Sequence, residues 1–156
     1  MARRFPPPTT GGLIATLVVA IAIVLVVNGL IFALGWAAPA TVADRPLLPA
    51  GWVIGAVWTV LIAMLAAAWW RLGGANDREA RRIARWLLAF IVFCVAYPFY
   101  TVGFSSAPMM LAANLATIAL DSLLVGRIWS LSRGAALLAF PVTPWVCFAT
   151  YASVGP

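Results

Sequence analysis

Residues 51–70 read GWVIGAVWTVLIAMLAAAWW, an uncharged run in which Thr59 is the only polar side chain apart from the indole N–H groups. A helix rises about 1.5 Å per residue, and the hydrocarbon core of a bilayer is about 30 Å thick. The run is therefore long enough and apolar enough to cross a membrane. We predict a transmembrane helix over this whole stretch.

The rest of the chain has the same character. Of its 156 residues, 65% are hydrophobic and 9% are charged, and the mean hydropathy is +1.05. Soluble domains are only about 45–50% apolar. Further long apolar runs occupy residues 13–36, 86–103, 108–130 and 135–154. We therefore predict an all-α integral membrane protein, with residues 1–156 forming a single bundle of five transmembrane helices.

Prolines lie inside two of the predicted helices. Pro98 falls in the third span, and Pro141 and Pro144 fall in the fifth. A proline inside a helix donates no backbone hydrogen bond, and its ring disturbs the carbonyl one turn earlier. We therefore expect the fifth helix to bend at these prolines. Between the second and third spans, Asn76 or Asp77 is suited to cap the next helix.

Arginine supplies all ten basic residues of the chain, whose formal net charge is +6. Arg45 alone would lie outside if the N-terminus were cytoplasmic, and the other nine would lie inside. Cytoplasmic segments of membrane proteins carry an excess of Arg and Lys. The distribution of arginines thus predicts a cytoplasmic N-terminus. We interpret the positive net charge as a signal of membrane topology, and not as a sign of nucleic-acid binding. The all-arginine set and the alanine-rich spans favour a GC-rich bacterial source, and hence a bacterial inner membrane.

Several kinds of site are excluded or disfavoured by residue type. The chain contains no histidine, which excludes a His-ligated metal or haem and a Ser-His-Asp triad. Cys94 and Cys147 each lie alone in an apolar run and are expected to be reduced packing thiols. We predict no metal site and no required cofactor.

Small residues recur at every fourth position of residues 51–70 and share one helix face. In lipid, such a seam lets helix backbones approach closely, so it predicts helix packing or a dimer interface. Trp52 and Trp58 fall about 60° to either side of Gly55 at 100° per residue. Trp52 is either a ligand contact or an interfacial anchor, and Trp58 is either a ligand contact or a packing residue. The seam consists of Gly51, Gly55, Thr59, Ala63 and Ala67.

The fourth span carries a polar stripe formed by Asn114, Thr117 and Asp121, at i, i+3 and i+7. Asp121 is the only acid within a predicted span. An ionisable group there is costly, and by default it faces the protein interior or a water-filled cavity and marks a functional site. Three roles remain open for Asp121: a polar anchor for a ligand, a general acid or base, or a structural group that locks two helices together.

Two segments resemble a known family. RPLLPAGWVIGAVWTVL (45–61) is similar to KPxWxPPxWVFGPVWTxLY, and AALLAFPVTPWVCFATYAS (135–153) to AALLLxPYLxWVxFATxLN, in the TspO/MBR family of translocator proteins or tryptophan-rich sensory proteins. YPFYTVG (97–103) stands where that family has WSPLFFG. The resemblance implies a compact bundle of five transmembrane helices, often dimeric. It also implies a pocket beneath the first loop for porphyrins, sterols or benzodiazepine-type drugs.

By position, Trp52 and Trp58 match the two tryptophans of WVFGPVW, and Trp145 and Ala149 match the Trp and Ala of WVxFAT. The chain also departs from the family pattern. Leu47 replaces the loop tryptophan, Cys94 an asparagine and Tyr97 a tryptophan, and Asp121 stands where the family usually has a small residue.

The leading hypothesis is a membrane binding protein, acting as carrier, transporter or sensor for a hydrophobic or tetrapyrrole- or sterol-like ligand held in the bundle under the first loop. A porphyrin or haem-type molecule is the candidate ligand, and the expected partners are membrane lipid, that ligand and a second copy in a homodimer, with no nucleic acid. The predicted ligand-binding residues are Trp52, Trp58, Cys94, Tyr97, Asn114, Asp121, Trp145 and Ala149.

Two alternatives belong to other functional classes. In the first, the protein is an intramembrane enzyme, and Asp121 is the general acid or base acting on a lipid-like or isoprenoid substrate. In the second, it is an assembly subunit whose partner surface is the seam around Gly51 and Gly55.

Overall fold

A computed structural model describes residues 9–36, 47, 49–75, 77–101 and 107–154, and these residues form helices without any strand. Five segments are long and apolar enough to cross a membrane, and α5 and α6 together make the fifth. The predicted all-α membrane bundle is thus confirmed. The helices are α1 (Thr10–Ala33), α2 (Gly51–Gly73), α3 (Arg78–Thr101), α4 (Ala107–Trp129), α5 (Arg133–Ala139) and α6 (Val142–Val154).

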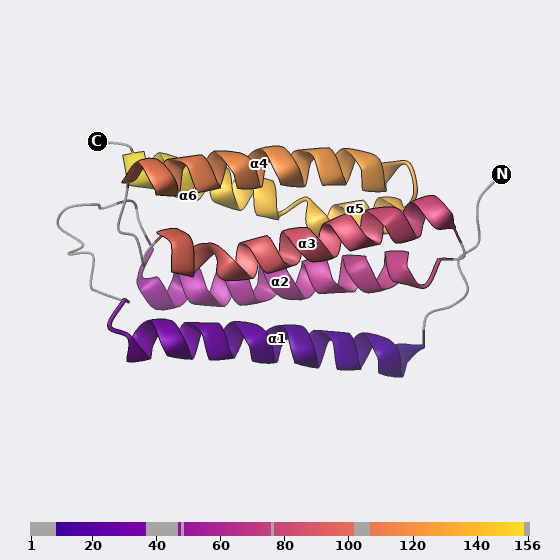
Figure 1. Ribbon diagram of the computed structural model, residues 1–156, viewed down its shortest axis with the longest axis horizontal. Helices are drawn as coiled ribbons and strands as arrows, with labels where there is room; N and C mark the ends of the chain where they lie inside the picture. The colour runs from indigo at the N-terminus through magenta and orange to yellow at the C-terminus, as the bar shows by residue number, and fades with distance from the viewer. Residues whose placement is uncertain (1–8, 37–46, 48, 76, 102–106, 155–156) are drawn as a thin grey trace.

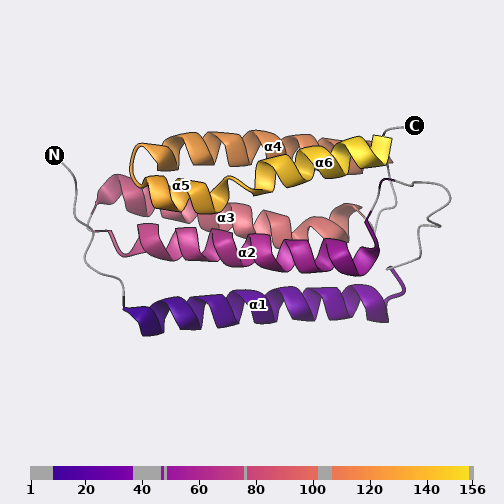
Figure 2. The same cartoon turned by 180° about the vertical axis from the view of Figure 1, so that it is seen from behind.

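The helices lie side by side along the long axis of the molecule (Figure 1). α1 lies at one edge of the bundle in both views (Figures 1 and 2), where it packs mainly against α2. α2 also packs against α3 and α5, and α4 packs against α3, α5 and α6. The interior therefore lies among α2 to α6, and α1 covers only one side of it.

The core is built from aliphatic side chains of α2 to α6. Leu65, Leu87 and Val142 are fully buried there. α1 contributes only Ala20 and Val24 to the buried residues. An apolar helix with so few buried residues is stable in a bilayer, because lipid tails solvate its outward-facing aliphatic side chains.

α3 begins before its apolar run, at the place where a capping residue was expected. It starts at Arg78, so the arginine-rich residues 78–85 are helical and precede the predicted membrane span at 86–103. The Asp77 carboxylate accepts a hydrogen bond from the backbone N–H of Glu79 at 3.1 Å, as expected of a capping residue. Ala80 and Ile83 are buried against the rest of the protein, which explains why this arginine-rich segment holds a helical conformation.

The fifth span is interrupted, as Figure 2 shows between α5 and α6. α5 ends at Ala139 and α6 begins at Val142, so the break falls on Phe140 and Pro141. This confirms the expected bend at Pro141. Pro144 lies in the first turn of α6, where a missing N–H costs no intrahelical hydrogen bond. Pro98 lies within α3, which continues to its end at Thr101.

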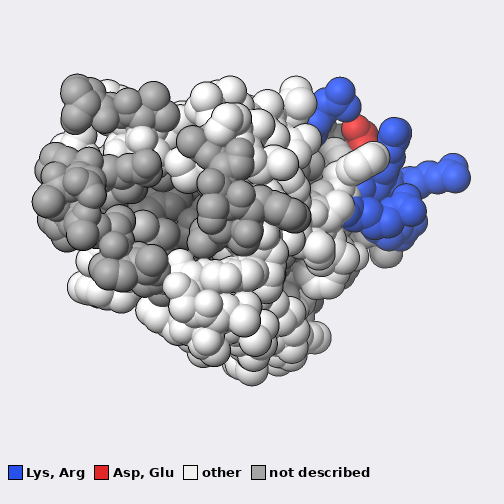
Figure 3. All heavy atoms as spheres, turned by 60° about the vertical axis from the view of Figure 1, so that its left-hand side comes forward, with Lys and Arg blue, Asp and Glu red and all other residues white. Residues whose placement is uncertain are grey.

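Arginine side chains gather at one end of the bundle (Figure 3), where α2 ends and α3 begins. At this end, Arg71 lies in the last turn of α2 and Arg127 lies in the last turn of α4. The opposite end contains the starts of α2 and α4 and the ends of α3 and α6. The structure is therefore strongly asymmetric in charge along the axis of its helices.

Candidate functional site

The polar stripe of α4 faces the interior of the bundle. Asn114 is 4% exposed, Thr117 is 1% exposed and Asp121 is fully buried. Their spacing of three and four residues places them on the side of α4 that packs against its neighbours. The Thr117 hydroxyl donates to the carbonyl of Ala113 at 2.8 Å, which satisfies it within its own helix. Asn114 and Asp121 instead reach across to other helices.

Asp121 is bound to the start of α6. Its Oδ2 accepts a hydrogen bond from the Thr143 backbone N–H at 3.1 Å and another from the Thr143 hydroxyl at 2.7 Å. Thr143 is the second residue of α6, and the first N–H groups of a helix have no partner within the helix. A carboxylate is also favoured at a helix N-terminus by the helix dipole. Asp121 thus caps α6 from a neighbouring helix.

This geometry corresponds to one of the three roles left open for Asp121. The acid links two helices, as in the structural role, through its hydrogen bonds to Thr143. The roles of Asp121 as ligand anchor and as general acid or base stay predictions.

Asn114 connects α4 with α3. The Tyr97 hydroxyl donates a hydrogen bond to Asn114 Oδ1 at 2.5 Å. The Tyr97 ring stacks on Trp58 of α2, with centroids 6.1 Å apart and planes inclined by 29°. Trp58, Tyr97 and Asn114, three predicted ligand-binding residues from three helices, therefore form one connected cluster, which we call the aromatic cluster.

Other rings of α3 hold Tyr97 in place. Tyr100 meets Tyr97 edge-on at 5.7 Å and stacks on Phe93 at 5.5 Å. The Tyr100 hydroxyl donates to the Phe93 carbonyl at 3.1 Å. Each of these rings is restrained by a neighbouring ring or by a hydrogen bond. The three aromatic side chains on this face of α3 are therefore fixed in position.

Two buried polar atoms in the described part of the chain have no hydrogen-bond partner. They are Asp121 Oδ1, an acceptor, and Trp145 Nε1, a donor. Leaving a buried polar group without a partner costs about 1–3 kcal/mol. Trp145 packs against the same hydrophobic core as Trp58. Among the described residues, these two atoms are thus the buried side-chain polar groups whose hydrogen-bonding capacity is not used.

The remaining predicted ligand-binding residues occupy different environments. Cys94 is 4% exposed and belongs to the hydrophobic core, one helical turn before Tyr97. Ala149 is half-buried on α6. Trp52 is 72% exposed near the start of α2. This exposure suits an interfacial anchor, and the role of Trp52 as a ligand contact stays a prediction.

The small-residue seam of α2 faces α1. A Cβ atom built at Gly55 lies 3.4 Å from Asn28 Nδ2 of α1, so the space beside Gly55 is filled by a helix of the same chain. At Gly51, by contrast, a Cβ atom meets nothing within 4 Å. The absence of a side chain at Gly55 thus permits the close approach of α1 and α2. A homodimer through this seam stays a prediction.

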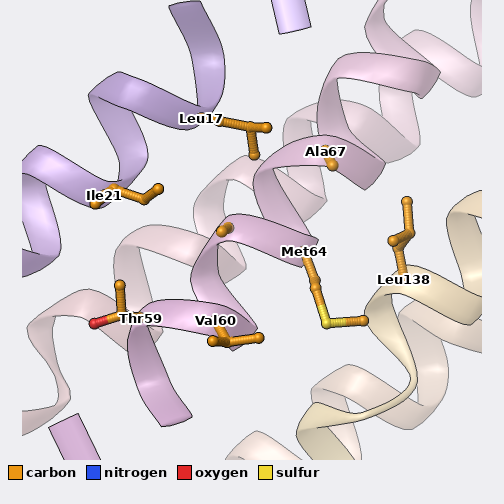
Figure 4. A pocket seen from close by; sticks show the side chains of 8 residues that line it. Leu17, Ile21, Thr59, Val60, Met64, Ala67 and Leu138 are labelled. Carbon is orange, nitrogen blue, oxygen red and sulfur yellow. The ribbon is translucent and has the colours of Figure 1, made fainter. Parts of the chain in front are cut away.

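Further along the seam, Thr59, Ala63 and Ala67 border an apolar groove of about 280 Å³. Figure 4 shows Leu17 and Ile21 of α1 on one side of it and Leu138 of α5 on the other. A second groove, of about 380 Å³, lies between α1, α2 and α3. Its lining includes Ala15, Thr16, Ala20, Ile62, Ala66, Trp69 and Ile91.

Sequence reasoning missed two residues that matter for this arrangement. Thr143 was not recognised as the partner of Asp121, and Asn28 was not placed against Gly55. The sequence does contain a signal for the pairing of Asp121 with Thr143. Leu131 lies in the turn between two antiparallel segments, and Asp121 and Thr143 lie at similar distances before and after it. Residues so placed meet at similar depths in the membrane. The choice of neighbour for α1 has no comparable signal.

Other predictions fall outside the structural description or concern metals. Residues 37–46 and 48, which include most of the first loop, are not among the described residues, so the pocket predicted beneath this loop lies partly outside them. Within the described ranges, no group of three or more His, Cys, Asp or Glu side chains is placed to hold a metal ion.

Comparison with protein families matches residues 15–155 to the TspO/MBR family, which covers nearly the whole chain. Comparisons with curated proteins and with solved structures gave no match. The family assignment agrees with the five apolar segments, which make the chain an integral membrane protein. It also supports a membrane-bound role in binding, transport or sensing in general terms. The chain thus belongs to the TspO/MBR family.

Proposed function

We propose that this protein binds a hydrophobic, flat ligand of tetrapyrrole or sterol type inside its helix bundle, as a carrier, transporter or sensor. The ligand would lie beside the aromatic cluster, with its polar groups directed toward Asp121 and Trp145. Family membership supports a binding role in general. The structural support comes from the side chains that face the interior.

The observation that carries the proposal is the pair of buried, unpartnered polar atoms, Asp121 Oδ1 and Trp145 Nε1. Buried polar atoms are nearly always hydrogen-bonded in native proteins, and each exception calls for a partner. Tetrapyrroles and sterols both combine a large apolar body with a few N–H, O–H or carboxylate groups. A ligand of this kind supplies the missing partners while its apolar body replaces lipid or side-chain contacts.

The aromatic cluster supports the flat shape of the ligand. Trp58 and Tyr97 already stack on each other, with their planes inclined by 29°. A planar ligand that binds beside these rings gains offset-stacked contacts with them. Asn114 holds the Tyr97 hydroxyl, so the ring is oriented before any ligand binds.

We also propose a bacterial inner membrane as the location, with the N-terminus in the cytoplasm. The all-arginine basic set and the alanine-rich spans support the bacterial source. The arginine-rich end of the bundle, which the positive-inside rule assigns to the cytoplasm, supports the orientation. Membrane lipid and a second copy of the chain are the other proposed partners, and no cofactor is needed for the proposed binding.

Native mass spectrometry of the detergent-purified protein tests the proposal. Protoporphyrin IX and a sterol are each added, and the adducts of the wild type, Asn114→Leu and Trp52→Phe are compared. We expect a stoichiometric adduct with at least one probe for the wild type and Trp52→Phe, and a weaker one for Asn114→Leu. No adduct with either probe, or equal adducts in all three proteins, would contradict binding at this interior site.

A further inference from the structure

The first turns of α3 carry four arginines on a single face. Arg78, Arg81, Arg82 and Arg85 are spaced at i, i+3, i+4 and i+7. At 100° per residue they fall within an arc of about 100°. All four side chains are exposed. We call this set the arginine stripe.

The opposite face of the same turns is buried, which fixes the direction of the arginine stripe. Ala80 and Leu87 are fully buried, and Ile83 and Ala84 are 7% and 4% exposed. Rotation of this part of α3 would expose these residues and bury arginines. The stripe is therefore held outward by packing.

Exposed tryptophans indicate the depth of the stripe relative to the membrane. Trp86 directly follows Arg85 and is 61% exposed, and Trp129, which ends α4 at the same end of the bundle, is 48% exposed. Tryptophan concentrates at the membrane–water interface. At about 1.5 Å per residue, Arg82 lies roughly 6 Å and Arg78 roughly 12 Å further out than Trp86. The headgroup layer is about 5–8 Å thick on each side of a bilayer, so Arg82 and Arg85 lie at headgroup level.

The surroundings of the stripe are positive. The acids described near it are Asp77 and Glu79, and Arg127 and Arg133 add positive charge at the same end. Figure 3 shows this end as a surface formed mainly by basic side chains. The guanidinium group binds phosphate oxygens in a bidentate manner, which lysine does not. The chain uses arginine alone for its basic residues.

We propose that the arginine stripe is a binding site for the phosphate groups of anionic phospholipids. The positive-inside rule accounts for positive charge anywhere in a connection, but it does not require one helix face. A continuous stripe at headgroup level, directed outward by a buried opposite face, is what binding of neighbouring lipid headgroups requires. The site lies at the end of the bundle and is independent of the proposed interior ligand.

The test uses the full-length protein in mixed micelles that contain equal amounts of phosphatidylglycerol and phosphatidylcholine, with retained lipids counted by native mass spectrometry. We compare R81Q/R85Q with R127Q/R133Q, which lose the same charge at the same end. The wild type should retain phosphatidylglycerol with a several-fold preference. R81Q/R85Q should lose most of this preference, and R127Q/R133Q should keep most of it. The preference of the wild type should also fall as salt is raised.

Three outcomes would overturn the proposal. The first is an absence of preference in the wild type, and the second is equal loss in the two double variants, which would indicate general surface charge. The third is full competition by millimolar inorganic phosphate, which would indicate a site for a soluble anion. The salt titration uses only the wild type, so it remains informative if a variant fails to insert into the membrane. A phosphatidylglycerol preference that does not change with salt would also contradict the proposal.

Discussion

Asp121 Oδ2 on α4 accepts both hydrogen bonds that Thr143 on α6 can donate, at 3.1 Å from its N–H and 2.7 Å from its hydroxyl. The break at Phe140 and Pro141 creates a helix start inside a membrane-spanning segment. Backbone groups at such a break must find partners, because the bilayer core supplies no water. The acid on α4 therefore makes the interrupted fifth span compatible with its depth in the membrane.

Removal of this carboxylate should destabilise the protein. We expect Asp121→Ala to lower the free energy of unfolding by about 1–3 kcal/mol, because two donors at the start of α6 lose their acceptor. Asp121→Asn should cost less, because its amide oxygen can still accept a hydrogen bond. Unfolding in mixed micelles with increasing SDS measures the difference.

A double-mutant cycle with Thr143→Val isolates the contact. This variant removes the hydroxyl but keeps the backbone N–H, so part of the interaction survives. We expect a coupling between Asp121→Ala and Thr143→Val of about 0.5–1.5 kcal/mol. Strictly additive effects, or an Asp121→Ala protein as stable as the wild type, would show that the contact between Asp121 and Thr143 does not stabilise the protein.

The hydrogen bond between Tyr97 and Asn114 should hold α3 and α4 together at the aromatic cluster. Tyr97→Phe keeps the ring stacked on Trp58 but removes the hydroxyl that donates to Asn114. We expect a loss of about 0.5–1.5 kcal/mol in unfolding free energy. Tyr151→Phe is the matched control, because Tyr151 is 64% exposed. If both variants lose the same stability, the bond does not stabilise the bundle.

Gly55 and Gly51 allow a matched test of the seam. Gly55→Leu should push Asn28, and with it α1, away from α2, because even a Cβ atom at Gly55 lies 3.4 Å from Asn28 Nδ2. Gly51→Leu should have little effect, because a Cβ atom there meets nothing within 4 Å. Disulfide crosslinking between cysteines introduced at Leu17 and Ala63 reports the distance between α1 and α2. Equal crosslinking in both glycine variants would refute the intrachain role of Gly55.

The orientation proposal predicts the location of the C-terminus. With the arginine-rich end in the cytoplasm, the end of α6 lies on the outer side. A protease-sensitive tag added after the last residue should therefore be cut when protease is added outside intact spheroplasts. A cytoplasmic reporter serves as the control for leakage. A tag that is cut only after lysis would reverse the orientation.

The sequence alone predicted the features that depend on composition and periodicity. The five apolar segments, the interruption at Pro141 and the family resemblance all follow from local patterns, which the structure and the family comparison confirm. Asp77 indicated where the third helix begins, and Arg78 is the first residue of α3. The burial of Ala80 and Ile83 on one face of this charged segment was not predicted, because it depends on contacts with other helices.

Contacts between helices were harder to predict. The interior of a membrane protein is no more apolar than its lipid-facing surface, so hydrophobicity does not tell which face of a helix packs inward. The sequence alone therefore did not distinguish the environment of Trp52, which is 72% exposed, from that of Trp58, which stacks on Tyr97. The pairing of Asp121 with Thr143 also depends on which helices are neighbours, which periodicity does not specify.

The most direct test of the proposed function is a titration of protoporphyrin IX into the purified protein, followed by quenching of tryptophan fluorescence, in the wild type and the Trp58→Phe and Trp52→Phe variants. Each variant loses one indole, but only Trp58 belongs to the aromatic cluster. Binding inside the bundle predicts saturable quenching, with affinity several-fold weaker in Trp58→Phe and unchanged in Trp52→Phe. Unsaturable quenching, or the same affinity in all three proteins, would contradict it.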